Sequence, residues 1–236
     1  MSGFIDLHAH YLPGVDDGVR DREEAIELLR GLRSLGFERA IATPHMRSAY
    51  FENERLELID AMKRFSESLH DEPGLPALGL GAEHHLDDRI FRRLLRGEGI
   101  PYPGAKAALI ELPEAQLPLA LDARFFDLQV RGIRPVIAHP ERYLPFFRSS
   151  RALKPLLEKG AVAQLDLMSL VGKYGKNQKR AAERMLDEGL YFIACSDAHR
   201  PRHLPLIERG LEALHQRVGD ETFRALLETN PASLIN

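Results

Sequence analysis

Residues 4–18, FIDLHAHYLPGVDDG, join a short apolar run to two histidines and two adjacent aspartates. The run Phe4–Leu7 favours a β-strand. The stretch Asp21–Leu35 carries apolar residues at helical spacing and is followed by Gly36, so it favours a helix. A strand, a polar loop and a helix in this order are typical of the crossover units that build parallel sheets. The segment therefore predicts an α/β fold with polar side chains after its first strand.

The same pattern recurs along the chain. Six further apolar runs are expected to be strands: Ala40–Ala42, Ala77–Leu80, Ala107–Leu112, Pro135–Ala138, Ala161–Leu165 and Tyr191–Ala194. Amphipathic stretches follow near residues 54–69, 87–95, 119–131, 151–159, 177–188, 204–217 and 220–228. About seven strand–helix units favour a closed or nearly closed barrel in a single domain spanning residues 1–236. A doubly wound open sheet is the alternative.

Composition narrows the function classes. The chain has 236 residues, 44% of them hydrophobic and 28% charged, and a formal net charge of −3. The sequence has no strongly basic charge balance that would favour nucleic-acid binding. It also has no apolar run of about 18 residues, which a membrane-spanning helix needs. The single cysteine, Cys195, allows no intramolecular disulfide and fits a reducing compartment. We therefore expect a cytoplasmic protein that binds neither nucleic acid nor membrane.

Residues able to bind metal follow most of the expected strands. The motifs are HAH after residue 7, TPH after 42, GAEHH after 80, IELP within 110–113, HPER after 138 and CSDAH after 194. Active sites of parallel barrels lie at the carboxyl ends of the strands. One histidine after a strand is usually a surface or capping residue, and Asp16 and Asp17 could simply cap the next helix. Chance does not explain why so many side chains able to bind metal follow the expected strands.

The ligand types indicate a metal cluster. His8 and His10 lie two residues apart and point to one side of an extended segment, as do Asp197 and His199. Imidazoles and carboxylates without thiolates suit Zn, Mn or Fe. Nine candidates exceed one tetrahedral site, so they predict two or three ions, an arrangement typical of phosphoester hydrolysis. The candidates are His8, His10, Asp16, His45, Glu83, Glu111, His139, Asp197 and His199.

Other residues are candidates for substrate contacts. Arg142 lies three residues after His139 and could bind phosphate oxygens through its guanidinium. Arg47 and either Arg200 or Arg202 are further catalytic candidates. Tyr50 and Phe51 could stack on an aromatic leaving group. Cys195 is expected in the core, because a nearby aspartate disfavours the thiolate that a cysteine-dependent phosphatase requires.

The motifs D-x-H-x-H, TPH, G-x-E, IELP, HPER and SDAH resemble those of the polymerase-and-histidinol-phosphatase (PHP) superfamily. The segments LPGVDDG, IATPH, ALIELP, IAHPERY and FIACSDAH resemble the bacterial capsule-operon tyrosine phosphatases of the CpsB/YwqE type. The resemblance covers residues 4 to 200. It implies a distorted seven-stranded (β/α) barrel of the TIM-like PHP type.

The resemblance also implies an activity. It predicts a manganese-dependent protein-tyrosine phosphatase with a trinuclear metal cluster and a metal-activated hydroxide. The first metal would be held by His8, His10, Glu83 and Asp197, the second by Glu83, Glu111 and His139, and the third by Asp16, His45 and His199. Asp17 would serve the turn or the helix. The substrate would be the C-terminal tyrosine cluster of a bacterial tyrosine autokinase that controls capsule or exopolysaccharide synthesis.

Two alternatives remain open. One keeps the metal site but changes the substrate to a small phosphomonoester such as histidinol phosphate. The other is a non-enzymatic binding module, which predicts missing ligands and fewer than two ions per chain.

Overall fold

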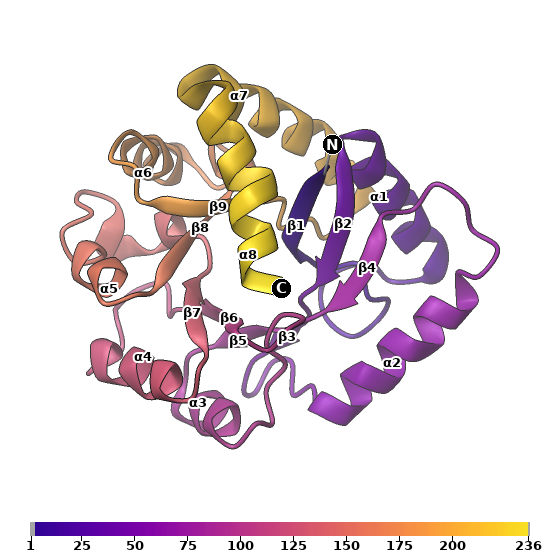
Figure 1. Ribbon diagram of the computed structural model, residues 1–236, viewed down its shortest axis with the longest axis horizontal. Helices are drawn as coiled ribbons and strands as arrows, with labels where there is room; N and C mark the ends of the chain where they lie inside the picture. The colour runs from indigo at the N-terminus through magenta and orange to yellow at the C-terminus, as the bar shows by residue number, and fades with distance from the viewer. Residues whose placement is uncertain (1–2, 236) are drawn as a thin grey trace.

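The computed structural model describes residues 3–235 as a ring of parallel strands surrounded by helices (Figure 1). The strands are β1 (Phe4–Ala9), β2 (Phe37–Ala42), β3 (His45–Met46), β4 (Ala77–Leu80), β5 (Glu83–His85), β6 (Ala107–Glu111), β7 (Arg134–Ile137), β8 (Val162–Asp166) and β9 (Tyr191–Cys195). They pair in the order β1-β2-β4 and β3-β5-β6-β7-β8-β9, and neighbouring strands in both sheets run parallel.

Nine strand segments occupy seven positions in the ring. β2 and β3 lie on either side of Thr43–Pro44, and β4 and β5 on either side of Gly81–Ala82. Pro44 has no N–H group and so cannot donate to a sheet ladder. The two broken strands stay together, because Gly81 N donates to Ala42 O at 2.8 Å and Glu83 N donates to Pro44 O at 3.1 Å.

The ring closes where β1 and β9 end. Asp197 N donates to His8 O at 2.9 Å, and His10 N donates to Ala198 O at 2.8 Å. Nearby, the C-terminal segment packs against β1 and β9, and Asn230 Nδ2 donates to Phe192 O at 2.8 Å. The expected distorted (β/α) barrel is confirmed. Because the strand order follows the chain without the reversal of a doubly wound sheet, the open-sheet alternative is wrong.

The helices follow the expected amphipathic stretches. They are α1 (Arg22–Ser34), α2 (Arg55–Ser68), α3 (Asp88–Leu95), α4 (Leu121–Val130), α5 (Lys154–Glu158), α6 (Lys176–Asp187), α7 (Leu204–Arg224) and α8 (Asn230–Ile235). Asp21 caps α1 by accepting from Glu24 N at 2.9 Å. Gly219, with φ of 71°, interrupts α7 between the two stretches expected there. None of the helices within residues 3–235 is long and apolar enough to cross a membrane.

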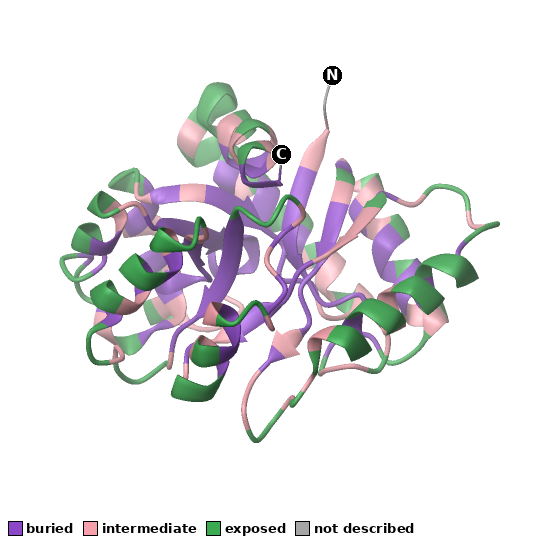
Figure 2. Ribbon diagram, turned by 60° about the horizontal axis from the view of Figure 1, so that its bottom comes forward, coloured by how far each residue is buried: buried purple, intermediate pink, exposed green. Residues whose placement is uncertain are grey.

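Burial separates the strands from the outer helix faces (Figure 2). A small apolar cluster includes alternate residues of three strands and the end of α8: Ala107, Leu109, Val136, Ala138, Ile193, Cys195, Leu234 and Ile235. Side chains two residues apart on a strand share a face. The faces that carry Leu109 and Cys195 therefore carry Glu111 and Asp197 next. The apolar cluster thus gives way to a polar site at the carboxyl ends of the strands.

Candidate metal centre

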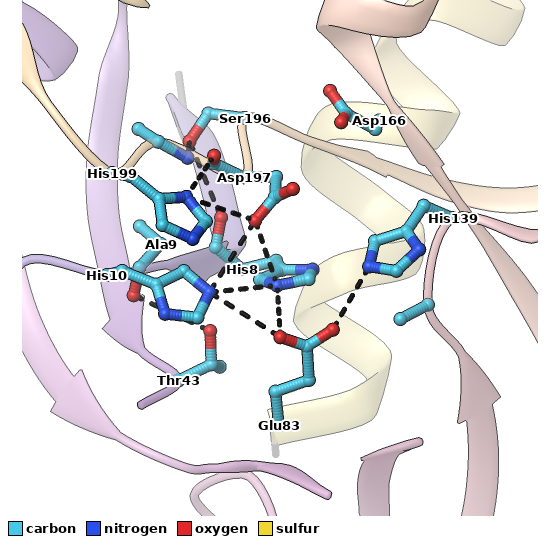
Figure 3. Close-up of polar contacts among 12 residues, drawn as sticks. His8, Ala9, His10, Thr43, Glu83, His139, Asp166, Ser196, Asp197 and His199 are labelled. Carbon is cyan, nitrogen blue, oxygen red and sulfur yellow. Dashed lines mark hydrogen bonds and ion pairs between the residues drawn. The ribbon is translucent and has the colours of Figure 1, made fainter. Parts of the chain in front are cut away.

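Imidazoles and carboxylates from separate strands meet at the carboxyl end of the barrel (Figure 3). Four sets of ligand atoms each lie within 4.8 Å of one another. The sets are His8, His10 and Asp197; His8, Glu83 and His139; His45, Glu83 and Glu111; and His10, Asp17, His45 and His199. The structure therefore brings together eight of the nine expected ligands, and Asp17 stands with them where Asp16 was expected.

The best-defined group has the dimensions of a metal shell. His8 Nε2 lies 3.2 Å from His10 Nε2, 3.3 Å from Glu83 Oε2 and 3.1 Å from Asp197 Oδ1. His10 Nε2 lies 3.6 Å and 3.5 Å from the same two oxygens. A tetrahedral shell with bonds of about 2.0–2.1 Å separates its ligand atoms by about 3.3–3.4 Å. Around His8 Nε2, the other three atoms therefore lie at the separations that the ligands of one divalent ion have.

Unsatisfied buried atoms support the same conclusion. Within residues 3–235, His45 Nδ1, His139 Nδ1 and Asp197 Oδ1 are buried and form no hydrogen bond. His45 Nδ1 lies 3.0 Å from Glu83 Oε2, close enough for an ion pair but without hydrogen-bond geometry. Buried polar atoms are normally satisfied, and a cation bound beside Glu83 and Asp197 would satisfy His45 Nδ1 and Asp197 Oδ1.

The ligand groups polarise one another. Burial alone would lower the pKa of the His8 imidazole, but the carboxylates of Glu83 and Asp197 outweigh it and raise that pKa to about 10. Burial would raise the pKa of both carboxyl groups, yet neighbouring cations, with His8 foremost, hold each pKa well below its usual range. Binding a metal ion here must therefore displace imidazole protons, so metal affinity should rise with pH.

A second layer orients the imidazoles. The Gln164 side-chain oxygen accepts from His8 Nδ1 at 3.0 Å, which leaves Nε2 for the centre. Asp6 accepts from Ser196 N at 3.1 Å and from His8 N at 3.2 Å, so it ties β1 to the segment after β9. The Asp6 carboxylate therefore positions the backbone that carries His8.

The structure places Asp17, where Asp16 was expected, among the ligand atoms. Asp16 Oδ2 accepts from His10 Nδ1 at 2.7 Å and from His45 N at 3.1 Å, while Oδ1 accepts from Gly18 N at 2.9 Å. Asp17 Oδ1 instead lies 3.4 Å from His45 Nε2 and 3.5 Å from His199 Nε2. Because hydrogen bonds occupy both oxygens of Asp16, the carboxylate that faces the metal-binding group belongs to Asp17.

Gly18 permits this loop geometry. A Cβ atom at position 18 would lie 2.2 Å from His10 O and 2.8 Å from Asp16 Oδ1. The loop also folds back through Val19 N, which donates to His10 O at 3.1 Å. Gly18, the last residue of LPGVDDG, is therefore required by the close approach of the loop to His10.

Two members of the site have an unusual backbone. His139 has a φ of 31° and Asp197 a φ of 48°. Left-handed conformations of residues other than glycine cost about 1–3 kcal/mol and cluster at functional sites. Backbone hydrogen bonds at the ends of β7 and β9 hold His139 and Asp197 at the carboxyl end of the barrel.

Arg142 extends from the short turn Pro140–Arg142 into the wall of the site. Its Nη1 donates to Asp197 Oδ2 at 2.7 Å and to Asp166 Oδ2 at 3.3 Å. Its guanidinium lies 4.5 Å from the centre of the Tyr174 ring. Neither Asp166, at the end of β8, nor Tyr174 was among the residues expected at the site from the sequence. Together these two residues fix the direction of Arg142.

A cavity of about 580 Å³ opens over the site. Arg47, Arg142 and Arg202 all line it, as does Arg200. Arg200 is engaged elsewhere, since its Nη1 donates to Glu24 Oε2 at 2.7 Å and its Nη2 donates to Asp17 O at 3.2 Å. Of the two arginines after SDAH, Arg202 is thus the one more available to an anion.

A comparison of the whole chain now identifies its family. Residues 4–236 match the family model described as "Capsular polysaccharide synthesis, CpsB/CapC". The chain belongs to the CpsB/CapC family. Among curated members, the tyrosine-protein phosphatase YwqE of Bacillus subtilis is 32% identical over 98% of this chain and 92% of its own length. The putative tyrosine-protein phosphatase CapC of Staphylococcus aureus is 30% identical over 98% of this chain and 89% of its own length.

Solved structures agree with this CpsB/CapC assignment. One chain from the crystal structures of YwqE from Bacillus subtilis and CpsB from Streptococcus pneumoniae, called unique metal-dependent tyrosine phosphatases, superposes with a TM-score of 0.90. It is 31% identical and the match covers 98% of this chain and 94% of that one. The phosphotriesterase homology protein of Escherichia coli, at 14% identity and a TM-score of 0.58, covering 100% of this chain and 99% of that one, shares the fold.

Proposed function

We propose that this chain is a metal-dependent protein-tyrosine phosphatase, a phosphoric monoester hydrolase that acts on phosphotyrosine. The observation that carries the proposal is the cluster of His10, Glu83 and Asp197 atoms around His8 Nε2, with Arg142 hydrogen-bonded to Asp197. The named activities of YwqE and CpsB support it. We also propose that residues 1–236 act as one domain.

The donor set suits two or three divalent ions, with Mn²⁺ as the proposed metal and Fe or Zn as alternatives. The first group would hold one ion. Glu83 would be shared with a second ion, together with Glu111 and His139, and a third would be held by Asp17, His45 and His199. Divalent ions bound there supply Lewis-acid stabilisation of phosphoryl oxygens and lower the pKa of nearby water.

The side chains of the protein supply the remaining chemistry. Arg142 presents a fixed guanidinium that can bind phosphate oxygens and stabilise the charge that develops on them. Gln164 and Asp16 hold the His8 and His10 rings in the orientation that directs Nε2 at the centre. The tyrosine phenol has a pKa of about 10, so it leaves more readily than a serine alkoxide.

We further propose the biological setting. The phosphotyrosine substrate would be the C-terminal tyrosine cluster of a bacterial tyrosine kinase that controls capsule or exopolysaccharide synthesis. The family description supports the link to capsular polysaccharide. The free, buried thiol of Cys195 fits a cytoplasmic location.

Chelation tests the proposal. The purified protein is treated with EDTA, and hydrolysis of p-nitrophenyl phosphate is followed with and without added Mn²⁺. We expect activity to vanish on chelation and to return with the metal. Full activity in the chelated protein would contradict a metal-dependent mechanism.

A further inference from the structure

Phe51 forms part of the cavity wall directly beside the metal centre. Its ring lies parallel to the imidazole of His45, with an interplanar angle of 13° and 5.2 Å between ring centres. We propose that Phe51 forms an aromatic subsite that binds the phenol ring of the substrate. This inference rests on the proposed function and deepens it, because it names a residue that selects aryl phosphates.

The backbone around Phe51 is held in place before any ligand binds. Arg47 and Phe51 form a two-way bridge, in which each backbone N–H donates to the other residue's carbonyl at 2.9 Å. Asn53 Nδ2 then donates to His45 O at 2.8 Å and to Val15 O at 2.9 Å. These bonds fix the loop to β3 and to the loop after β1. A preorganised ring loses little conformational entropy when a ligand stacks on it.

The rest of the wall explains why Phe51 is the residue for this role. Most of the cavity lining is polar or charged: Arg47, Glu114, Arg142, Lys173, Gln178 and Arg202 among others. The other aromatic residue there is Tyr174, but Arg142 lies 4.5 Å and Lys173 Nζ 4.9 Å from its ring centre. Within the described residues, no arginine or lysine lies over the ring of Phe51, one face of which packs on the His45 imidazole. Its ring is therefore the apolar surface left for an aromatic ligand.

Geometry limits where the phenol ring can lie. In an aryl phosphate, a single oxygen joins the ring to phosphorus. A phosphate bound at the metal ions that the group containing His45 would hold must therefore place its ring against the side chains that directly surround this group. Phe51 stacks on His45 and belongs to that layer, whereas a phosphoserine side chain offers no ring to stack. Aromatic pairing of this kind favours aryl over alkyl ligands.

Tyr50 is not part of the subsite. Its side chain is 72% exposed, and the guanidinium of Arg47 lies 4.7 Å from the centre of its ring. Tyr50 does not line the cavity. Of the two aromatic residues in this loop, Phe51 alone faces the site.

Ligand binding separates this role from a purely structural one. Benzylphosphonate and methylphosphonate carry the same head group and are not hydrolysed, and their Kd values are measured by calorimetry on the manganese-loaded protein. We expect the wild type to prefer benzylphosphonate and Phe51→Ala to lose about tenfold of that preference. Phe51→Tyr should retain it. Phe126→Ala, the same change at an exposed ring on α4, is the matched control and should behave as the wild type.

Turnover provides the second readout. For Phe51→Ala we expect kcat/KM on a phosphotyrosine peptide to fall about tenfold and kcat/KM on a phosphoserine peptide to stay unchanged, with metal content equal to the wild type. Equal losses on both ligand types, or no loss on either, would overturn the subsite. If the wild type fails to hydrolyse phosphotyrosine but Phe51→Ala still loses the preference for benzylphosphonate, the proposed function fails and the subsite stands.

Discussion

Asp16 Oδ2 accepts a hydrogen bond from His10 Nδ1 at 2.7 Å. This contact directs the opposite ring nitrogen, His10 Nε2, toward His8 Nε2. A carboxylate behind an imidazole fixes its tautomer and raises its basicity as a ligand. Asp16 therefore acts through His10, while its neighbour Asp17 faces the centre.

Substituting the two aspartates separately tests this division. Asp17→Asn should remove one ion per chain even at saturating Mn²⁺ and lower kcat by more than about 100-fold. The reason is that the substitution removes a carboxylate ligand that faces the metal centre. Asp16→Asn should keep full stoichiometry but bind metal about 10–100-fold more weakly. Metal content by mass spectrometry, alongside kcat, measures both.

Asp21→Asn is the matched control, because Asp21 caps α1 and asparagine caps a helix equally well. Loss of an ion in Asp16→Asn, with Asp17→Asn unaffected, would reverse the assignment.

Arg142 should matter to catalysis without mattering to metal loading. Arg142→Lys keeps the positive charge beside Asp166 and Asp197 but loses the planar fork that matches phosphate. We expect kcat/KM to fall about 10²-fold with unchanged metal content. Arg217→Lys, which alters an exposed ion pair with Asp187, should leave kcat/KM unchanged. A loss of metal in Arg142→Lys would show that the arginine supports the ligands instead.

His84 should make stability depend on pH. It is fully buried and neutral, with Nδ1 donating to Leu109 O at 2.9 Å and Nε2 accepting from Ile100 N at 3.1 Å. Burial lowers its pKa to about 4, whereas the unfolded chain titrates at the ordinary value of 6.5. The unfolded state thus binds more protons between these values, so stability is complete above pH 6.5 and declines by about 3 kcal/mol as pH falls to 4.

His84→Gln should flatten the dependence of folding stability on pH in this range. Urea unfolding of the metal-free protein from pH 4 to 7 measures the difference, and the exposed His70→Gln serves as the control. Parallel profiles for the wild type and His84→Gln would contradict the assignment.

Much of the fold was predictable because each strand is an apolar run and each helix has an amphipathic period. The breaks in the second and third strands were not, since they depend on how Thr43–Pro44 and Gly81–Ala82 meet in space. The expected metal ligands come together because most of them lie in or just after the carboxyl-terminal part of a strand. Asp16 and Asp17 have the same chemistry, and only the fold of the loop onto His10 distinguishes them. Tyr174 lies on a separate loop, so no local pattern connects it to Arg142.

The end of the chain should contribute to stability but not to chemistry. Leu234 on α8 is 3% exposed and packs in the apolar cluster with residues of β1 and β9. Leu234→Ala should lower the free energy of unfolding by about 2–4 kcal/mol. Leu119→Ala, at a side chain that is 90% exposed, should change it by less than about 0.5 kcal/mol. Activity per folded molecule should be unchanged in both, and a selective loss in Leu234→Ala would show that α8 shapes the site.

Hydrolysis of phosphotyrosine at the metal centre can be tested in one comparison of substrates. The most direct measurement compares kcat/KM of the manganese-loaded protein on a phosphotyrosine peptide, a phosphoserine peptide and histidinol phosphate. We predict clear preference for the phosphotyrosine peptide, and no turnover of it after chelation. Preference for histidinol phosphate, or equal turnover of all three, would contradict the account.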